Sequence, residues 1–232
     1  MFLFDPSGPV IAISFLLAAL FCADAVRRAG ILQASMRDHM IWALATAAVF
    51  LGHQMSINLP GGIELHYMGS AFLALLLGYP RALLSMTLVL LGSALMKGAI
   101  TSLGVQIFFH AVIPITLMMI ISRTIQRTLP PNLFICLLGN GFIGLFLAYA
   151  FEHLIALGGR ALLISDDLGP GAMTLSDITP YALLLASGEA WLEGMVITVL
   201  VVFAPGVVRM FDDAFYLRPP NAPGASDPNN RR

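Results

Sequence analysis

Two histidines and two methionines gather in one short polar stretch of an otherwise apolar chain. The stretch reads GHQMSINLPGGIELHYMG, and it places His53 and Met55 before a Pro-Gly-Gly turn and His66 and Met68 after it. Imidazole and thioether groups suit nickel, cobalt, copper and zinc, whereas magnesium and calcium prefer oxygen ligands. Because a short turn brings its two sides together, the spacing predicts that His53 and His66 bind one metal ion.

Other polar residues could complete such a site. His110 is the third candidate imidazole, Met55 and Met68 are candidate thioether ligands, and Glu64 or Glu189 could orient the rings by accepting hydrogen bonds. A histidine or glutamate inside a membrane helix can also serve only to hydrogen-bond across helices. That alternative remains open for His110 and His153, and we favour it for Glu193.

The elements that position these residues belong to a membrane protein. Of 232 residues, 58% are hydrophobic and only 11% are charged, against roughly 25% charged residues in soluble domains. The formal net charge of −1 gives no basis for a nucleic-acid partner. Cys22 and Cys136 each lie within apolar runs, which favours buried thiols over a disulfide.

The hydropathy pattern predicts an all-α, polytopic protein with about seven transmembrane helices and no second domain. A membrane-spanning helix needs about 20 apolar residues, and Pro80 divides one long apolar run into two shorter helices. We expect residues 1–217 to form the transmembrane domain and residues 218–232 to be a disordered cytoplasmic tail. The expected helices span residues 9–26, 39–58, 66–79, 81–98, 103–122, 132–157 and 180–204.

Arginine positions predict the orientation of this bundle. With the N-terminus outside and seven helices, ten of the 12 basic residues fall on one side, and only Lys97 and Arg160 fall on the other. Basic residues concentrate in cytoplasmic loops. We therefore predict an outside N-terminus and a cytoplasmic C-terminus in a bacterial inner membrane, with the polar stretch facing outward.

Motifs for catalysis and nucleotide binding are missing. The chain contains no Gly-x-x-x-x-Gly-Lys loop, no His-Glu-x-x-His, no Gly-x-Ser-x-Gly and no dinucleotide-binding glycines. We therefore expect no enzymatic activity and no intrinsic cofactor, so that a metal ion would be a transported substrate. Any ATP-driven step would need a separate ATPase subunit.

The polar stretch and the apolar run that follows it resemble a known family. Gln-Met, Asn-x-Pro and His-x-x-Gly occur in order before a Leu-rich helix, as in the CbiM/NikM type of substrate-binding subunit of cobalt and nickel energy-coupling-factor (ECF) transporters. The later stretches TSLGVQIFFHAVIP and EAWLEGMVITVLVV are also similar to family motifs. The shared residues of the first motif are Gln54, Met55, Asn58, Pro60, Gly62, His66 and Gly69.

This resemblance implies an ECF substrate-subunit bundle with a metal site at the outer helix ends. It implies a metal ligand at His66, and partnership with an ECF membrane scaffold subunit and cytoplasmic ATPases. The family also begins Met-His and chelates metal with that N-terminus, whereas this chain begins Met1-Phe2. His53 stands where the family is apolar, and His110 where it has methionine, so the expected ligand set shifts toward imidazole.

Two other functions remain open at this point. The chain could handle or deliver a metal, copper included, without an ATPase, or it could bind an organic solute with its polar groups lining the cavity. The residues do not distinguish among cobalt, nickel, copper and zinc. Co-purification with an ATPase would separate the first alternative from the transporter. Bound metal in the purified protein would separate both of these from the binding of an organic solute.

Overall fold

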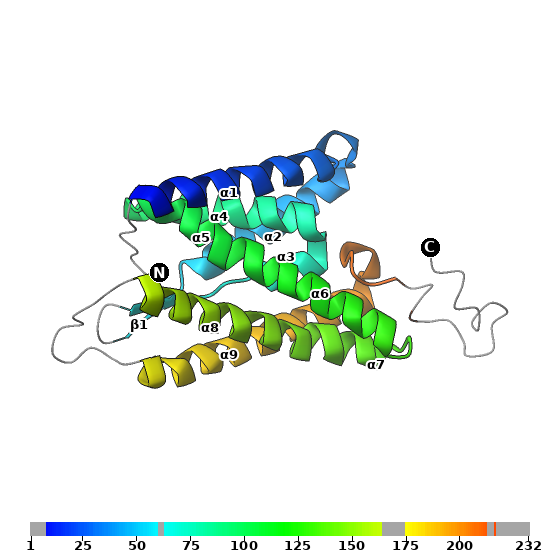
Figure 1. The fold of residues 1–232 in the computed structure, drawn as a ribbon. Coiled ribbons are helices and arrows are strands. Elements are labelled where there is room, and N and C mark those ends of the chain that lie inside the picture. Colours follow the sequence, from blue (N-terminus) through cyan, green and yellow to red (C-terminus); the bar gives the residue numbers. More distant parts are fainter. Residues whose placement is uncertain (1–7, 60–62, 164–174, 213–215, 217–232) are drawn as a thin grey trace.

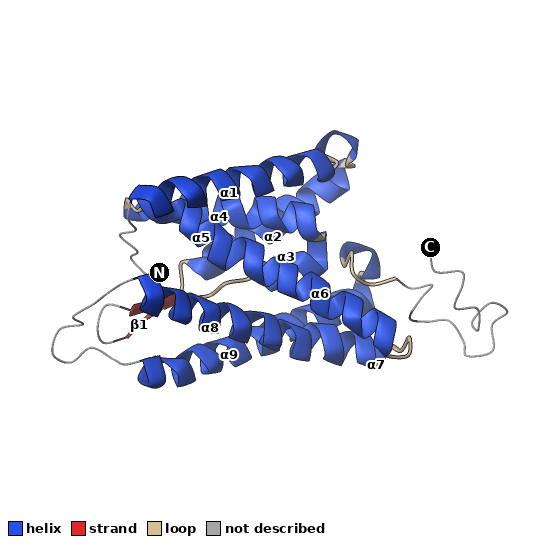
Figure 2. Ribbon diagram, viewed as in Figure 1, coloured by secondary structure: helices blue, strands red, loops and turns tan. Residues whose placement is uncertain are grey.

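The computed structural model shows a bundle of long helices that run along a common direction (Figure 1). It describes residues 8–59, 63–163, 175–212 and 216, with the side chains of residues 57–59, 63–65, 159–163 and 175 excepted. The expected tail, residues 218–232, lies outside the described residues. Figure 2 shows that the described part consists of helices joined by loops, apart from one small hairpin near one end.

The helices follow the chain with short connections. The N-terminal half contains α1 (Gly8–Arg28), η1 (Ile31–Gln33), α2 (Met36–His53), the strands β1 (Ser56–Leu59) and β2 (Ile63–His66), α3 (Ser70–Leu77) and α4 (Tyr79–Lys97). The C-terminal half contains η2 (Ile100–Ser102), α5 (Leu103–Ile107), η3 (Phe108–Val112), α6 (Ile113–Thr128), α7 (Leu133–Ile135), η4 (Cys136–Gly144), α8 (Leu145–Leu163), α9 (Leu175–Phe203) and η5 (Pro205–Val207).

The all-α fold class is confirmed, and each of the seven expected segments contains a helix. Among the described residues, five helical stretches are long and apolar enough to cross a membrane. These five stretches are Gly8–Gln33, Tyr79–Lys97, Ile100–Thr128, Leu133–Gly158 and Ser176–Phe203. The two remaining expected spans correspond to α2 and α3, and both differ from the expectation at their ends.

The second expected helix was predicted too long. α2 ends at His53, and residues 56–59 form an antiparallel strand that pairs with residues 63–66, with Ser56 opposite His66. The Pro-Gly-Gly sequence lies between the paired strands, so the polar stretch is a hairpin rather than the tip of a helix. At its other end α2 begins with a capping box, in which Ser35 and Asp38 each bond the other's backbone amide.

The third expected helix begins four residues later than predicted, and it is too short to cross a bilayer. The eight residues of α3 rise about 12 Å at 1.5 Å per residue, while a hydrocarbon core is about 30 Å thick. Every residue of α3 is buried. The irregular segment 67–69 and α3 therefore cross the bundle together, surrounded by the longer helices, because His66 lies beside the end of α4 and Leu77 lies beside its start.

A glycine, rather than Pro80 itself, makes the turn between α3 and α4. Gly78 has a φ of +76°, a conformation that favours glycine, while Pro80 lies in the first turn of α4, where its missing N–H costs no hydrogen bond. Beyond the turn, the amides of Arg209 and Met210 donate to the carbonyls of Leu76 and Leu75. The end of α3 is thus capped by the chain that follows α9.

Two π-helical segments interrupt the long helices. The first, η3, contains His110 and precedes Pro114. Proline removes an amide donor and its ring clashes with the carbonyl four residues earlier, which here belongs to His110, so a locally widened turn is the expected response. The second, η4, contains Gly141 and packs against α9 at Gly194.

We predict that Gly194→Ala destabilises the bundle and that Gly188→Ala does not. A methyl group at Gly194 would meet the Gly141 carbonyl oxygen and the Phe142 ring, the latter at 2.7 Å, whereas nothing lies within 4 Å of a methyl at Gly188. Overpacking of this kind costs about 1–3 kcal/mol. Thermal unfolding of the two purified variants in the same detergent measures the difference, and equal Tm values would contradict this packing.

Candidate functional site

The hairpin brings His53 and His66 together at the end of α2. His53 is the last residue of α2 and His66 is the last residue of β2. Their rings stack with centroids 5.0 Å apart and planes inclined by 24°. Both side chains are buried. The sequence-based expectation that the turn pairs these two imidazoles is therefore met in the fold.

Backbone hydrogen bonds fix which nitrogen of each imidazole carries the proton. The Nδ1 atom of His53 lies 2.8 Å from the Tyr67 carbonyl oxygen, and the Nδ1 atom of His66 lies 3.2 Å from the His53 carbonyl oxygen. A carbonyl only accepts, so each Nδ1 must donate. In a neutral ring this leaves the Nε2 lone pair, which is the group that binds a metal ion.

Lys97 extends from the end of α4 to one of these lone pairs. Its Nζ atom lies 3.4 Å from Nε2 of His66, and an ammonium group only donates hydrogen bonds. The His66 imidazole is buried, whereas Lys97 is exposed. The potential ligand atom of His66 is thus in contact with a positive charge that belongs to the protein.

Buried polar side chains from α8 and α9 bind the backbone of residues 67–69 and of the first turn of α3. The amide of Met68 donates to Glu189 at 3.2 Å, and the amide of Phe72 donates to the Tyr149 hydroxyl at 3.1 Å. Tyr149 in turn donates to Glu193 at 2.7 Å. Amides in the first turn of a helix have no intrahelical partner, and Gly69 provides no side-chain cap, so Tyr149 caps α3.

His110 and His153 flank one glutamate. The Nδ1 atom of His110 lies 2.5 Å from Oε1 of Glu152, and the Nδ1 atom of His153 lies 2.7 Å from Oε2 of the same carboxyl group. All three side chains are buried. His110 thus makes an interhelical hydrogen bond to Glu152, which was one alternative for it, whereas His153 lies next to Glu152 on α8 and its Nδ1 atom donates to the Tyr149 carbonyl of the same helix at 2.7 Å. Glu193 accepts a hydrogen bond from Tyr149, which is the structural role favoured for it.

The remaining candidate ligands are dispersed. Met55 is exposed, with 73% of its surface accessible, whereas Met68 is buried and its amide is bonded to Glu189. The side chain of Glu64 lies outside the described residues. Within the described part of the chain, no group of three or more His, Cys, Asp or Glu side chains is arranged to hold a metal ion. The described candidate site is therefore a pair of imidazoles.

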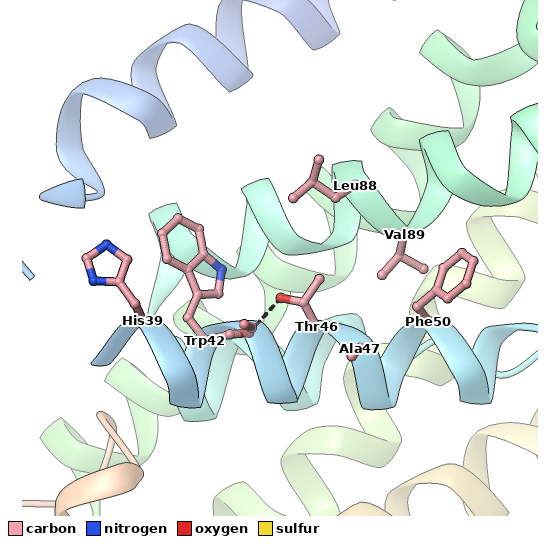
Figure 3. Close-up of a pocket in the computed structure, with 8 residues that line it drawn as sticks. His39, Trp42, Thr46, Ala47, Phe50, Leu88 and Val89 are labelled. Carbon is pink, nitrogen blue, oxygen red and sulfur yellow. Dashed lines mark hydrogen bonds between the residues drawn. The ribbon is translucent and has the colours of Figure 1, made fainter. Parts of the chain in front are cut away.

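A separate groove of about 580 Å³ lies between α2 and α4 (Figure 3). Trp42, Thr46 and Phe50 line it along α2, and Leu88 and Val89 along α4. Two of these lining residues, Trp42 and Thr46, donate hydrogen bonds to Ser85 of α4. His39 is its only imidazole among the described residues, so the groove has an apolar character and lies apart from the histidine pair.

Comparison with known families identifies the chain. The model of the CbiM family, described as the cobalt uptake substrate-specific transmembrane region, matches residues 6–207. The chain belongs to the CbiM family. It is accordingly a multi-pass membrane protein, as its composition suggested.

One relative and two solved structures extend this assignment. The chain is 27% identical over 172 residues to a protein of Archaeoglobus fulgidus assigned as a fused nickel transport protein, NikMN, and it spans 55% of that protein's length. Two crystal structures of transition metal transporters, one truncated, share the fold at 23% identity, with TM-scores of 0.67 and 0.65. They cover 85% and 84% of this chain, which in turn covers 97% and 91% of them.

Sequence reasoning missed three residues of this CbiM-family site. Tyr149 and Lys97 were not predicted to belong to the site, and Glu152 was noted only for its expected depth in the membrane. Each contacts a residue more than 30 positions away, as in the Tyr149–Glu193 and Lys97–His66 pairs. The available signal was the requirement that a buried carboxyl group has a partner, which applies to both Glu152 and Glu193.

We predict that Tyr149→Phe destabilises the protein by about 1–3 kcal/mol. Removal of the hydroxyl group leaves the Phe72 amide buried without its partner, at about 1–3 kcal/mol, while Glu193 keeps its hydrogen bond with Tyr67. Tyr181→Phe is the matched control, because Tyr181 lies exposed on α9. Thermal unfolding in detergent compares the two variants, and a Tyr149→Phe protein as stable as the control would show that the cap is dispensable.

Proposed function

We propose that this CbiM-family chain is the substrate-binding membrane subunit of an ECF-type transporter for a divalent transition metal ion. The observation that carries the proposal is the stacked pair of imidazoles, each with Nδ1 bonded to a backbone carbonyl. Two Nε2 lone pairs fixed at one place suit nickel, cobalt, copper or zinc. The family match supports metal uptake as the role of this pair.

The contact between Lys97 and His66 suggests how such a site would take up its substrate. The ammonium group occupies the direction in which Nε2 of His66 would bind an ion. A metal ion that binds there must first displace Lys97, because one lone pair cannot serve both. Release of the ion would allow Lys97 to return, so the site would hold a positive charge in both states.

Transport would require partners that the chain itself does not provide. No nucleotide-binding motif occurs in the sequence, so an ECF scaffold subunit and cytoplasmic ATPases would supply the energy. The predicted orientation would place the histidine pair outside and the arginine-rich end of the bundle toward the ATPases. Co-purification of a membrane scaffold and an ATPase with the full-length chain would support this assembly, whereas metal-dependent uptake without them would contradict it.

We predict that His66→Ala lowers the affinity for the bound metal by more than about tenfold, and His53→Ala nearly as much. Loss of a residue that only orients a ligand already costs about 10–100-fold in affinity, so loss of a ligand should cost more. His39→Ala, on α2 but at its opposite end, should bind like the original protein. Calorimetric titration of nickel, cobalt, copper and zinc decides the outcome.

Folding effects can be separated from ligand effects in this experiment. His66→Ala removes the hydrogen bond to the His53 carbonyl as well as Nε2, so each variant is first compared by thermal unfolding without metal. If His66→Ala is folded and binds every metal as the original protein does, the proposed site is incorrect. If the original protein binds none of the four metals, transition-metal transport itself is excluded.

A further inference from the structure

A positively lined cavity lies at the end of the bundle opposite the histidine pair. It has a volume of about 410 Å³ and contains side chains from the end of α1, the α3–α4 turn, α6 and the segment after α9. α4 runs between the two sites, because it begins next to this cavity at Tyr79 and ends at Lys97 beside His66. The two sites are therefore separated by the length of that helix.

Four arginines line the cavity, and each comes from a different part of the chain. They are Arg28, Arg81, Arg123 and Arg209, and none of the described residues that line the cavity is acidic. Arg28 also forms an ion pair with Asp24 at 2.8 Å. Like charges around one space repel one another, and low-dielectric walls strengthen that repulsion. An anion in the cavity would remove this penalty.

The guanidinium group of Arg81 and the backbone of Arg209 are held in place by contacts within the protein. Nε of Arg81 donates to the Ala29 carbonyl at 3.0 Å, and its guanidinium carbon lies 5.8 Å from the centre of the Trp42 ring system. The Arg209 amide donates to the Leu76 carbonyl. A guanidinium group that is already oriented loses little freedom when it binds an anion, and its planar fork matches phosphate oxygens.

The rest of the lining fits an amphiphile better than a free anion. Ala74, Leu77, Met119 and Met210 contribute apolar surface beside the guanidinium groups. The amino end of α4 also lies at the cavity, and helix amino ends favour negative charge. Basic pockets between transmembrane helices are known places for anionic lipid headgroups.

We propose that this cavity binds a phosphate group, supplied by the headgroup of an anionic phospholipid. One lipid would occupy the cavity with its phosphate among Arg81, Arg123 and Arg209 and the first part of its acyl chains against the apolar lining. This bound lipid would tie the ends of α1, α4 and α6 to the chain after α9. The inference stands on its own and does not depend on which ion the histidine pair binds.

Thermal unfolding of the full-length protein in lipid nanodiscs tests this proposal. The Tm should rise by about 3–6 °C in phosphatidylglycerol relative to phosphatidylcholine. This is the increase expected when the lipid concentration is about tenfold above its Kd for a protein of this size. Arg123→Gln and Arg81→Gln should lose most of this increase. Arg127→Gln and Arg37→Gln, which remove the same charge at the same end without lining the cavity, should keep it.

Each protein is compared with itself in the two lipids, so a variant that is less stable in both still gives a result. An equal loss in the control variants overturns the proposal in favour of general surface attraction, and no increase in the original protein overturns it because no anionic lipid is bound. An equal increase from inorganic phosphate in phosphatidylcholine discs retains the phosphate site but overturns the lipid as its source. Stabilisation by an acidic peptide but not by phosphatidylglycerol overturns it in favour of a protein partner.

Discussion

The bundle encloses a stretch of backbone that cannot satisfy its own hydrogen bonds. Residues 67–69 are not part of any regular element, and they enter the bundle together with the first turn of α3, which lacks a capping side chain. Inside a membrane protein such backbone is tolerated only where protein groups bond it. Glu189 and Tyr149, which are both buried, provide those groups for the amides of Met68 and Phe72. These two bonds therefore hold residues 67–69 and the start of α3 in position.

The same constraint connects the fold with its proposed chemistry. The Tyr67 carbonyl accepts the His53 Nδ1 proton, and the His53 carbonyl accepts that of His66, so the imidazoles satisfy backbone oxygens through Nδ1 alone, and Nε2 of His66 contacts Lys97 instead. A structural requirement and a metal-binding function thus need not compete for the same atoms. Most described arginines lie at the opposite end of the bundle, so the two ends differ in both charge and chemistry.

Much of the fold followed from the sequence, because the lengths of the apolar segments and the positions of the arginines can be determined along the chain without knowledge of how the helices pack. The seven segments, the turn before Pro80 and the pairing of His53 with His66 were all predicted in this way. The hairpin at residues 56–66 and the late start of α3 were missed, since the apolar pattern of the sequence does not reveal that part of a crossing segment is non-helical. The partners of Glu152 and Glu193 were missed because contacts between helices depend on how the helices pack together, and the sequence of one helix does not determine that packing.

Hydrogen exchange of individual amides is the measurement closest to the central claim, which is that Glu189 and Tyr149 hold a buried, irregular segment in place. The Met68 and Phe72 amides should exchange as slowly as those in the buried centre of α4, because both are bonded and enclosed. Exchange of these two amides as fast as that of amides in the exposed first turn of α2 would contradict the account.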